Sequence, residues 1–472
     1  MAESIAPIKT NKISSLILYA VVAGAPFPFG STSHSAIAVW CGVLGIGLLF
    51  ASPRGLNKSH LALLAGIGII IAAYGFVLHE QLSDTPWIAT PDPIWAQASA
   101  ALGVPITPSV SIVRYEPFYA LGAPLACLLA LICGLIVAND RDHAALALRV
   151  MAWSGAVYAA YGIASLLLDP TMLLWREKTA YVGNLTGTFI NRNTAAAYFG
   201  SCSAVWLLLL LQRIRERLPK GPIVWMKVPG QIVTDTHRDI LIRFTVFFVC
   251  LAAMFMTSSR AGVMVSLLAM VIAFVIFFRR DLPRGKGLVV ALVGAGCVAL
   301  ILLEFIGGNV GARFDVGGVA DQGRIEAYRS TLRMIADRPW FGIGLGNFAW
   351  GFPPYRSASV SMYGVWDRAH DTPLEFAAEM GIPLTMVVAV GWVVAFGVLI
   401  KGILRGRRRA IVPLTALTVS LIALSHSLVD FSLQIPGYAI VVFALLGVGL
   451  AQSSQSHEAR PQISTRPKTP LR

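Results

Sequence analysis

Apolar residues along this chain are gathered into long, nearly continuous runs rather than short alternating stretches. A helix needs about 20 predominantly apolar residues to cross the hydrocarbon core of a bilayer. The pattern therefore predicts twelve membrane-spanning helices, at residues 13–30, 35–52, 61–79, 119–138, 145–168, 194–212, 241–257, 261–278, 287–306, 381–400, 410–430 and 435–452.

Two longer polar segments interrupt the runs. Residues 80–118 are rich in Pro and Trp, and we expect them to form a loop that caps one face. Residues 307–380 form the largest loop and separate the first nine spans, within 1–306, from the last three, within 381–452. The terminal segment 453–472 is rich in Ser, Gln, Pro and Arg, a composition typical of disorder.

Composition agrees with the run pattern. The chain is 56% hydrophobic and only 13% charged, with a mean hydropathy of +0.69, whereas soluble domains carry roughly 25% charged residues. The six cysteines all lie inside apolar runs and form no CxxC pair, so neither a disulfide framework nor a zinc site is indicated. The prediction is an all-α polytopic membrane protein without a cofactor.

The net charge of +14 is better explained by membrane topology than by nucleic-acid binding. With the N-terminus inside, 26 of the 38 Lys and Arg fall on the cytoplasmic side and 12 on the outer side. This split follows the positive-inside rule. Both termini are then cytoplasmic, and the loops 80–118 and 307–380 lie outside. We expect the basic inner loops to contact anionic lipid headgroups.

The 307–380 loop is unusual because it holds most of the outer positive charge. Its cations are Arg313, Arg324, Arg329, Arg333, Arg338, Arg356 and Arg368, and its one histidine is His370. Eight acidic residues accompany them, so the loop is close to neutral and its cations must be placed among partners. Fixed guanidinium groups on this side suit an anionic ligand such as a lipid pyrophosphate.

Two short stretches before this loop reach the same side. In 187–194, Asn191 and Asn193 are both possible caps for the following helix, with Asn193 the expected N-cap, and Arg192 is a candidate ligand contact. In Ser258–Gly262, Arg260 is the only charge. Two interpretations of Arg260 remain open: a side chain held by headgroup phosphate, or a fixed cation for a lipid-linked pyrophosphate.

Residues 323–339 predict an amphipathic helix on the membrane face. Ile325, Tyr328, Leu332 and Ile335 recur at helical spacing, with Asp321 as a possible cap and Pro339 at the end. Arg324 falls in the first turn, where a helix N-terminus favours anions. The following 341–348 is glycine-rich, which permits tight turns, but no preceding strand makes it a dinucleotide fingerprint.

The last stretches surround the following span. In 368–381, His370 is either an ordinary surface residue or a group for proton transfer near neutral pH. Glu375 and Glu379 share a helix face, so one of them is a candidate to orient His370, as is Asp371; helix N-terminal charge is the alternative. Ionisable groups at membrane depth usually have partners. Asp430, beside His426 and Gln434, is therefore expected to pair with an outer Arg.

Taken in order, these stretches resemble the O-antigen ligase and polysaccharide polymerase family of bacterial inner-membrane enzymes. The similarity covers about 187–449 and is strongest at Ser259-Arg-Ala-Gly, Gly323-Arg, Arg338-Pro-Trp-Phe-Gly-Ile-Gly-Leu-Gly-Asn-Phe and Ala369-His-Asp. The resemblance implies a C-type glycosyltransferase (GT-C) architecture with about twelve spans. It also implies an undecaprenyl-pyrophosphate-linked glycan donor, no metal and no nucleotide sugar. Arg260 and Arg324 match the family's essential arginines, and His370 its essential histidine.

The resemblance predicts a multi-pass inner-membrane glycosyltransferase with a periplasmic site and an acceptor that is a glycan or lipid A-core. Asp371 after His370, and Leu384 at the last position of the ligase pattern, depart from ligases and favour a polymerase slightly. The candidate substrate contacts are Asn191, Arg192, Tyr355, Arg368, Glu379 and Asp430. Two rival classes remain, a lipid-linked glycan flippase or other secondary transporter, and a non-catalytic partner in polysaccharide assembly.

Overall fold

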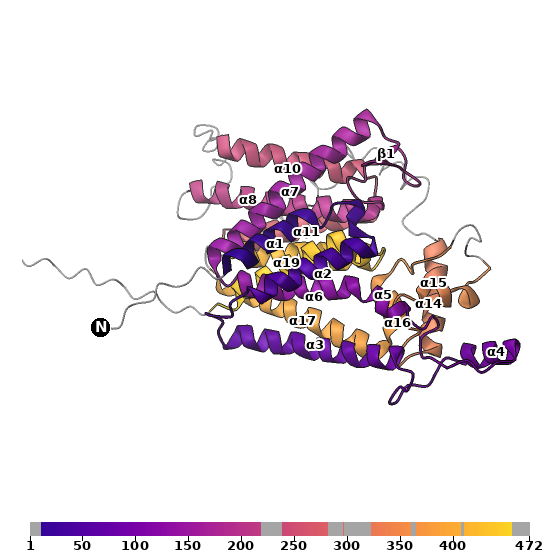
Figure 1. Cartoon of the computed structure of the whole chain (residues 1–472). Helices are drawn as coiled ribbons and strands as arrows, with labels where there is room; N and C mark the ends of the chain where they lie inside the picture. Colours follow the sequence, from indigo (N-terminus) through magenta and orange to yellow (C-terminus); the bar gives the residue numbers. More distant parts are fainter. Residues whose placement is uncertain are drawn as a thin grey trace, which may run out of the picture.

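The computed structural model describes residues 11–218, 238–281, 296, 322–358, 360, 365–406 and 410–455, and within them the chain is a bundle of helices (Figure 1). Eight of the described helices are long and apolar enough to cross a membrane. They are α3 (Lys58–Leu82), α5 with α6 (Glu116–Ala120 and Gly122–Val137), α7 (Arg141–Leu168), α8 (Arg192–Arg217), α10 (Arg238–Met256), α11 (Arg260–Phe278), α17 (Ile382–Arg405) and α19 (Pro436–Ser453).

Three shorter apolar helices complete the agreement with the predicted runs: α1 (Asn11–Gly24), α2 (His34–Leu49) and α18 (Ile411–Ser427). Except for residue 296, the predicted span 287–306 lies outside the described residues, as do 307–321 of the large loop and 456–472 of the terminal tail. Each of the other predicted runs corresponds to a helix. An all-α polytopic membrane protein is therefore confirmed.

The centre of the bundle is formed by α8 and α19, while α3 and α17 lie on its outside. Small residues let the central helices approach closely. A Cβ added at Gly134 of α6 would lie 2.4 Å from the carbonyl oxygen of Ala444, and one at Gly447 of α19 would lie 2.2 Å from that of Leu131. These reciprocal contacts hold α6 and α19 backbone to backbone.

The short elements gather at one end of the bundle, which we call the loop end (Figure 1). They are the 3₁₀ turns η1 (Phe29–Ser31), η3 (Pro353–Tyr355) and η4 (Ser432–Gln434), the hairpin of β1 (Met172–Leu173) and β2 (Arg176–Glu177), and the helices α4 (Pro93–Leu102), α14 (Gln322–Asp337), α15 (Phe348–Gly351) and α16 (Thr372–Met380).

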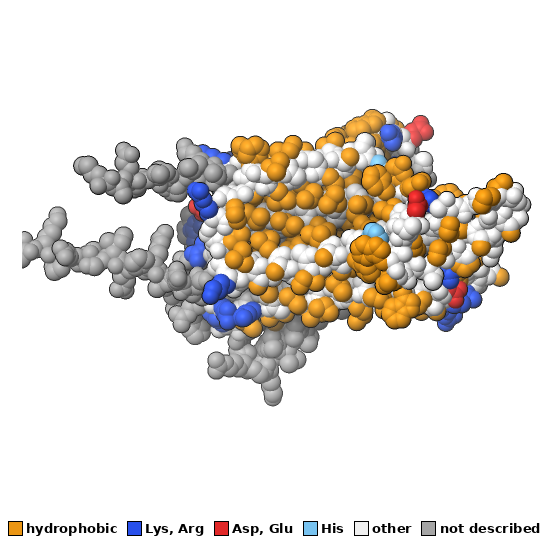
Figure 2. Space-filling model, turned by 60° about the horizontal axis from the view of Figure 1, so that its bottom comes forward, with side chains coloured by type: hydrophobic (Ala, Val, Ile, Leu, Met, Phe, Trp, Pro, Cys, Tyr) orange, Lys and Arg blue, Asp and Glu red, His pale blue; other side chains and the backbone are white. Residues whose placement is uncertain are grey.

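The opposite end carries many of the Lys and Arg side chains seen in Figure 2, and we call it the basic end. Arg215 of α8 pairs with Asp281 at 3.0 Å, and Arg279 donates to the Ile403 carbonyl of α17. Helix ends from distant parts of the sequence are therefore joined there. A bundle with one strongly basic end matches the charge asymmetry on which the predicted topology rests.

The loop 80–118 packs onto the glycine-rich segment, in agreement with its expected capping role. The backbone N–H of Ile112 donates to the Ile343 carbonyl at 3.0 Å, and Asp92 pairs with Arg338 at 3.1 Å. The glycines provide the turns predicted for them, since Gly342, Gly344 and Gly346 all have positive φ. At Gly342, a Cβ would lie 2.3 Å from the backbone of Glu379, so only glycine fits.

The predicted apolar face of 323–339 is wrong in part. Leu332 is 53% exposed, whereas the buried face of α14 consists of Ala327, Ser330, Thr331, Met334 and Ile335. The reason is that α14 packs directly against α16 and η3, where small side chains allow close approach. The expected cap Asp321 lies outside the described residues.

Candidate functional site

A buried carboxylate, Asp430, is the centre of a polar cluster at the loop end. Its side chain is 1% exposed. Oδ2 of Asp430 accepts a hydrogen bond from Asn193 Nδ2 at 2.5 Å and pairs with Arg324 Nη2 at 3.3 Å, while Oδ1 accepts from the backbone N–H of Phe431 at 2.7 Å. The expected pairing of Asp430 with an outer arginine is therefore present, and the arginine is Arg324.

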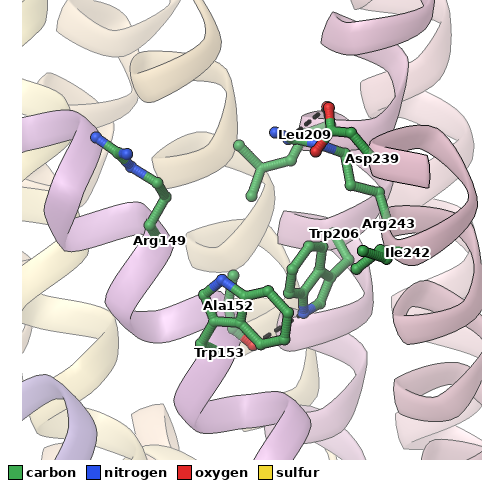
Figure 3. Close-up of a pocket in the computed structure, with 8 residues that line it drawn as sticks. All are labelled: Arg149, Ala152, Trp153, Trp206, Leu209, Asp239, Ile242 and Arg243. Carbon is green, nitrogen blue, oxygen red and sulfur yellow. Dashed lines mark hydrogen bonds and ion pairs between the residues drawn. The ribbon is translucent and has the colours of Figure 1, made fainter. Parts of the chain in front are cut away.

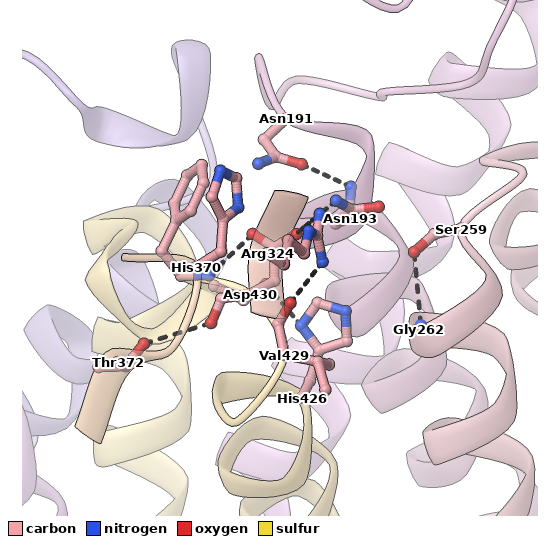
Figure 4. A network of polar contacts seen from close by, with 12 residues as sticks. Asn191, Asn193, Ser259, Gly262, Arg324, His370, Thr372, His426, Val429 and Asp430 are labelled. Carbon is pink, nitrogen blue, oxygen red and sulfur yellow. Dashed lines mark hydrogen bonds and ion pairs between the residues drawn. The ribbon is translucent and has the colours of Figure 1, made fainter. Parts of the chain in front are cut away.

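Four separate segments meet at this cluster (Figure 4). Asn193 lies in the first turn of α8, Arg324 in the first turn of α14, and Thr372 at the start of α16, with Asp430 following α18. Arg324 Nη1 also donates to the Val429 carbonyl at 2.5 Å, and Thr372 Oγ1 donates to that of Asp430 at 3.4 Å. The segments that the sequence singled out separately are thus held together by hydrogen bonds.

The cap of α8 differs from the prediction. Asn191, not Asn193, is the N-cap, and its Oδ1 accepts from the backbone N–H of Asn193 at 2.7 Å. Asn193 lies two positions past the cap, in the first turn of the helix, which leaves its side-chain amide available for Asp430. The assignment of Asn193 as N-cap was therefore wrong, and its contact with Asp430 was not predicted.

The turn that carries Arg260 packs against the N-terminal part of α8, one turn from Asn193. Ser259 caps α11, with its Oγ accepting from the Gly262 N–H at 3.4 Å. A Cβ added at Gly262 would lie 2.4 Å from the Cβ of Ala196. Arg260 is the first residue of α11, and Ser258 before it has φ +56°, which reverses the chain at this point. The start of α11 therefore lies beside the start of α8, which contributes Asn193.

His370 lies next to this cluster in a constrained backbone conformation. Its φ is +58°, a left-handed value that costs a non-glycine residue about 1–3 kcal/mol. Tyr328 Oη donates to the His370 carbonyl at 3.0 Å. The imidazole packs against the rings of Trp366 and Phe431, with centroid distances of 5.7 and 5.2 Å. Since Phe431 directly follows Asp430, the imidazole borders the Asp430 segment.

Glu375 holds the chain on the N-terminal side of His370. Its carboxylate is 1% exposed; Oε1 accepts from Arg368 Nη1 at 3.0 Å, and Oε2 accepts from the Ala369 N–H at 2.6 Å. Burial raises the pKa of Glu375, and the Arg368 charge opposes that rise. Glu375 thus fixes the backbone leading into His370.

The other two carboxylates considered for His370 also bind backbone. Asp371 caps α16 by accepting from the Leu374 N–H at 2.8 Å, and burial raises its pKa. Glu379 accepts from the Phe348 N–H at 3.0 Å. Burial, and secondarily the nearby Glu375 charge, raise the pKa of Glu379 to about 8. Glu379 therefore ties α16 to the glycine-rich segment.

Two further candidate contacts lie at the edge of the cluster or away from it. Arg192 stacks on Tyr181 at 5.0 Å and reaches Asn184 Oδ1 at 3.3 Å. Tyr355 Oη donates to Asp337 at the C-terminal end of α14, at 2.7 Å. Because Arg324 lies at the other end of α14, the two sites are separated by roughly 20 Å of helix. The structure does not bring Tyr355 to Asp430.

The prediction that the loop's arginines are placed among partners agrees with the part of the loop that the structure describes. Arg329 pairs with Glu326 at 2.5 Å, Arg338 with Asp92 at 3.1 Å, and Arg368 with Glu375 at 3.0 Å. Across the described ranges, no group of three or more His, Cys, Asp or Glu side chains is arranged to hold a metal ion.

Comparison with known proteins identifies the segment that contains most of these residues. Residues 245–389 match a family model described as O-Antigen ligase. The matched segment includes Arg260, Arg324 and His370, whereas Asn193 and Asp430 lie on either side of it. A search of curated proteins found no significant match. The resemblance inferred from the short stretches is therefore confirmed for the segment that contains three of the four.

Proposed function

We propose that this chain, which carries an O-antigen ligase domain at residues 245–389, is a membrane glycosyltransferase that moves a glycan from undecaprenyl pyrophosphate to an acceptor sugar. The supporting observation is the convergence of Asn193, Arg324 and Asp430 beside His370 at one end of a membrane bundle. The family match supports a lipid-linked glycan donor and an acceptor in general. The identity of the lipid carrier, the roles of the residues and the side of the membrane on which transfer occurs are part of this proposal.

The loop end has the electrostatic character that a pyrophosphate requires. The helices α8, α11, α14 and α16 all begin there, and helix N-termini carry partial positive charge from unpaired N–H groups. Arg324 and Arg260 lie in the first turns of α14 and α11 and add full charges. Asp430 is a buried counter-ion of Arg324, and its carboxylate holds the guanidinium in position.

The proposed reaction is a single displacement. The acceptor hydroxyl attacks the anomeric carbon of the donor, a new C–O bond forms, and the bond to pyrophosphate breaks with its electron pair on the phosphate oxygen. Arg260 and Arg324 stabilise the negative charge that develops on this leaving group. His370 takes the proton from the attacking hydroxyl. Attack from the face opposite the leaving group inverts the anomeric centre, and no metal is required to balance the charge.

Topology supports a periplasmic site in the inner membrane. The loop end lies opposite the basic end, and cytoplasmic loops normally carry the excess of Lys and Arg. With this orientation both termini are cytoplasmic. Asp371 and Leu384 depart from the ligase pattern, so we favour a polymerase that joins repeat units over a ligase that acts on lipid A-core.

The test is reconstitution of the full chain with a defined lipid-linked repeat unit, with and without a chelator, followed by analysis of product length. A ladder of chain lengths, unchanged by chelator, supports a polymerase. One added mass on lipid A-core identifies a ligase. Transport of the intact lipid-linked unit across the bilayer, without any new glycosidic bond, supports the flippase alternative and refutes the proposal.

A further inference from the structure

A second candidate site lies near the basic end, far from the cluster around Asp430. A pocket of about 110 Å³ opens between α7, α8 and α10. It is lined by Arg149, Ala152 and Trp153 of α7, Trp206 and Leu209 of α8, and Asp239, Ile242 and Arg243 of α10 (Figure 3). Basic side chains at its rim and aromatic rings within it make the pocket amphipathic.

The pocket lies toward the basic end of α7 and α8, two helices that are long and apolar enough to cross a membrane. Arg149 lies eight residues after the start of α7, and Trp206 lies eleven residues before the end of α8. At about 1.5 Å per residue, these positions are roughly 12 and 16 Å from the ends of their helices. A cation at this depth is expected to have an anionic partner.

The described residues that line the pocket supply little negative charge to Arg149. The only acidic residue that lines the pocket, Asp239, pairs with both Arg213, at 2.8 Å, and Arg243, at 3.1 Å. Within the described ranges, Arg149 forms no ion pair, and its Nε donates to the Ala145 carbonyl of its own helix at 3.4 Å. Arg213 also pairs with Glu216, at 3.0 Å. Three guanidinium groups therefore face two carboxylates, which leaves one net positive charge, and Arg149 carries it.

The outer face of α7 continues the pocket as an apolar track. Arg149, Trp153 and Val157 are spaced four residues apart, so they share one face of the helix. Trp153 is 51% exposed and Val157 is 65% exposed. Trp153 packs edge-to-face against Trp206, whose indole N–H already donates to the Ala152 carbonyl at 2.8 Å. The ring pair is therefore rigid and offers apolar surface below the cation.

We propose that this pocket binds an anionic phospholipid of the leaflet at the basic end, with Arg149 contacting the phosphate and one acyl chain lying along Trp153 and Val157. The charged group and the apolar track are arranged in the order in which a phospholipid presents its phosphate and chain. The local positive charge favours a lipid with net negative charge over a zwitterionic one. This site is independent of the proposed transferase activity.

The experiment is native mass spectrometry of the full-length protein in detergent, titrated with phosphatidylglycerol, phosphatidylcholine or soluble glycerol phosphate. Arg149→Gln removes the proposed phosphate contact, and Arg405→Gln removes an exposed cation at the same end that is not part of the pocket. We expect the tightest phosphatidylglycerol adduct to weaken about tenfold in Arg149→Gln, as for loss of one charge-assisted contact. It should change little in Arg405→Gln and in Arg149→Lys.

A second measurement keeps the test valid if Arg149→Gln is unstable. Phosphatidylglycerol with a brominated acyl chain should quench a fraction of tryptophan fluorescence that is missing in Trp153→Phe. The proposal is overturned if Arg149→Gln binds phosphatidylglycerol like the wild type, or if Arg405→Gln loses as much affinity. Equal binding of phosphatidylcholine overturns the charge argument, and equal binding of glycerol phosphate overturns the lipid assignment. Quenching that is unchanged in Trp153→Phe contradicts the placement of the chain.

Discussion

Replacement of Glu375 tests whether the backbone around His370 is held for catalysis. Glu375 binds both the Arg368 guanidinium and the Ala369 N–H immediately before His370. Glu375→Ala removes both acceptors. Glu375→Gln keeps a side-chain oxygen for one of them but loses the charge. The pair of variants therefore separates loss of the hydrogen bonds from loss of the charge.

The expected loss of stability is modest. Ala369 is fully buried, so its N–H is left unpaired in Glu375→Ala, at a cost of about 1–3 kcal/mol. The Arg368 side chain is 37% exposed, so solvent screens it and its lost ion pair adds roughly 0–1 kcal/mol. Glu375→Gln should lose about half as much, because the amide oxygen replaces one acceptor.

The expected loss of activity is larger than the loss of stability. Without Glu375 the left-handed conformation of His370 is no longer enforced, and a misplacement of about 1 Å reduces transfer roughly 100-fold. The loss should appear in kcat with little change in KM for the donor, because Arg260 and Arg324, the proposed pyrophosphate contacts, are untouched. Transfer from a lipid-linked repeat unit, normalised to folded protein by thermal unfolding, measures both effects. Glu326→Gln, which removes a carboxylate paired with exposed Arg329, is the matched control.

The reasoning is refuted if Glu375→Ala transfers glycan at the wild-type rate while folded. It is equally refuted if Glu326→Gln transfers glycan as slowly as Glu375→Ala. Loss of any ion pair in the loop would then be enough to reduce transfer, and the position of Glu375 next to His370 would not matter.

Three further predictions concern neighbouring residues. Asp430→Ala should weaken donor binding by roughly tenfold or more, because Arg324 loses a buried counter-ion; unchanged donor affinity contradicts this. Glu379 titrates near pH 8 when folded and near its ordinary value of 4.5 when unfolded. The folded state therefore holds the extra proton, and stability should fall as pH rises from about 5 to 8. Glu379→Gln should flatten that dependence in thermal melts, and a slope identical to that of the wild type would show that another group is responsible. Gly342→Ala should lower the melting temperature markedly, because its Cβ would meet the Glu379 backbone at 2.3 Å; a wild-type melting temperature would contradict the close approach.

The helices were predictable because each span must satisfy its backbone inside an apolar segment, which leaves a strong pattern of runs. Positions set by short-range chemistry were also predictable. Arg324 in a first turn and the glycines at 342, 344 and 346 agree with the structure.

What the sequence did not predict depends on which elements pack together. The buried face of α14 follows from its contact with α16, which no periodicity records. Asn191 and Asn193 are both possible caps in isolation, and the choice between them is linked to Asp430, 237 residues from Asn193. Tyr355 is distant from Asp430 because the chain reverses after α14. The role of Glu375 toward Arg368 was missed, because the two are seven residues apart and Arg368 lies outside the helix that carries Glu375.

The most direct test of the central claim is a single-turnover measurement that separates donor binding from transfer. Purified His370→Ala and Arg324→Gln variants are compared with wild type for binding of a labelled undecaprenyl-pyrophosphate glycan and for formation of the glycosidic bond. If His370 and Arg324 act on the same bound donor, His370→Ala should bind the donor normally but form no glycosidic bond. Arg324→Gln should bind the donor poorly. Normal bond formation by His370→Ala would contradict the account.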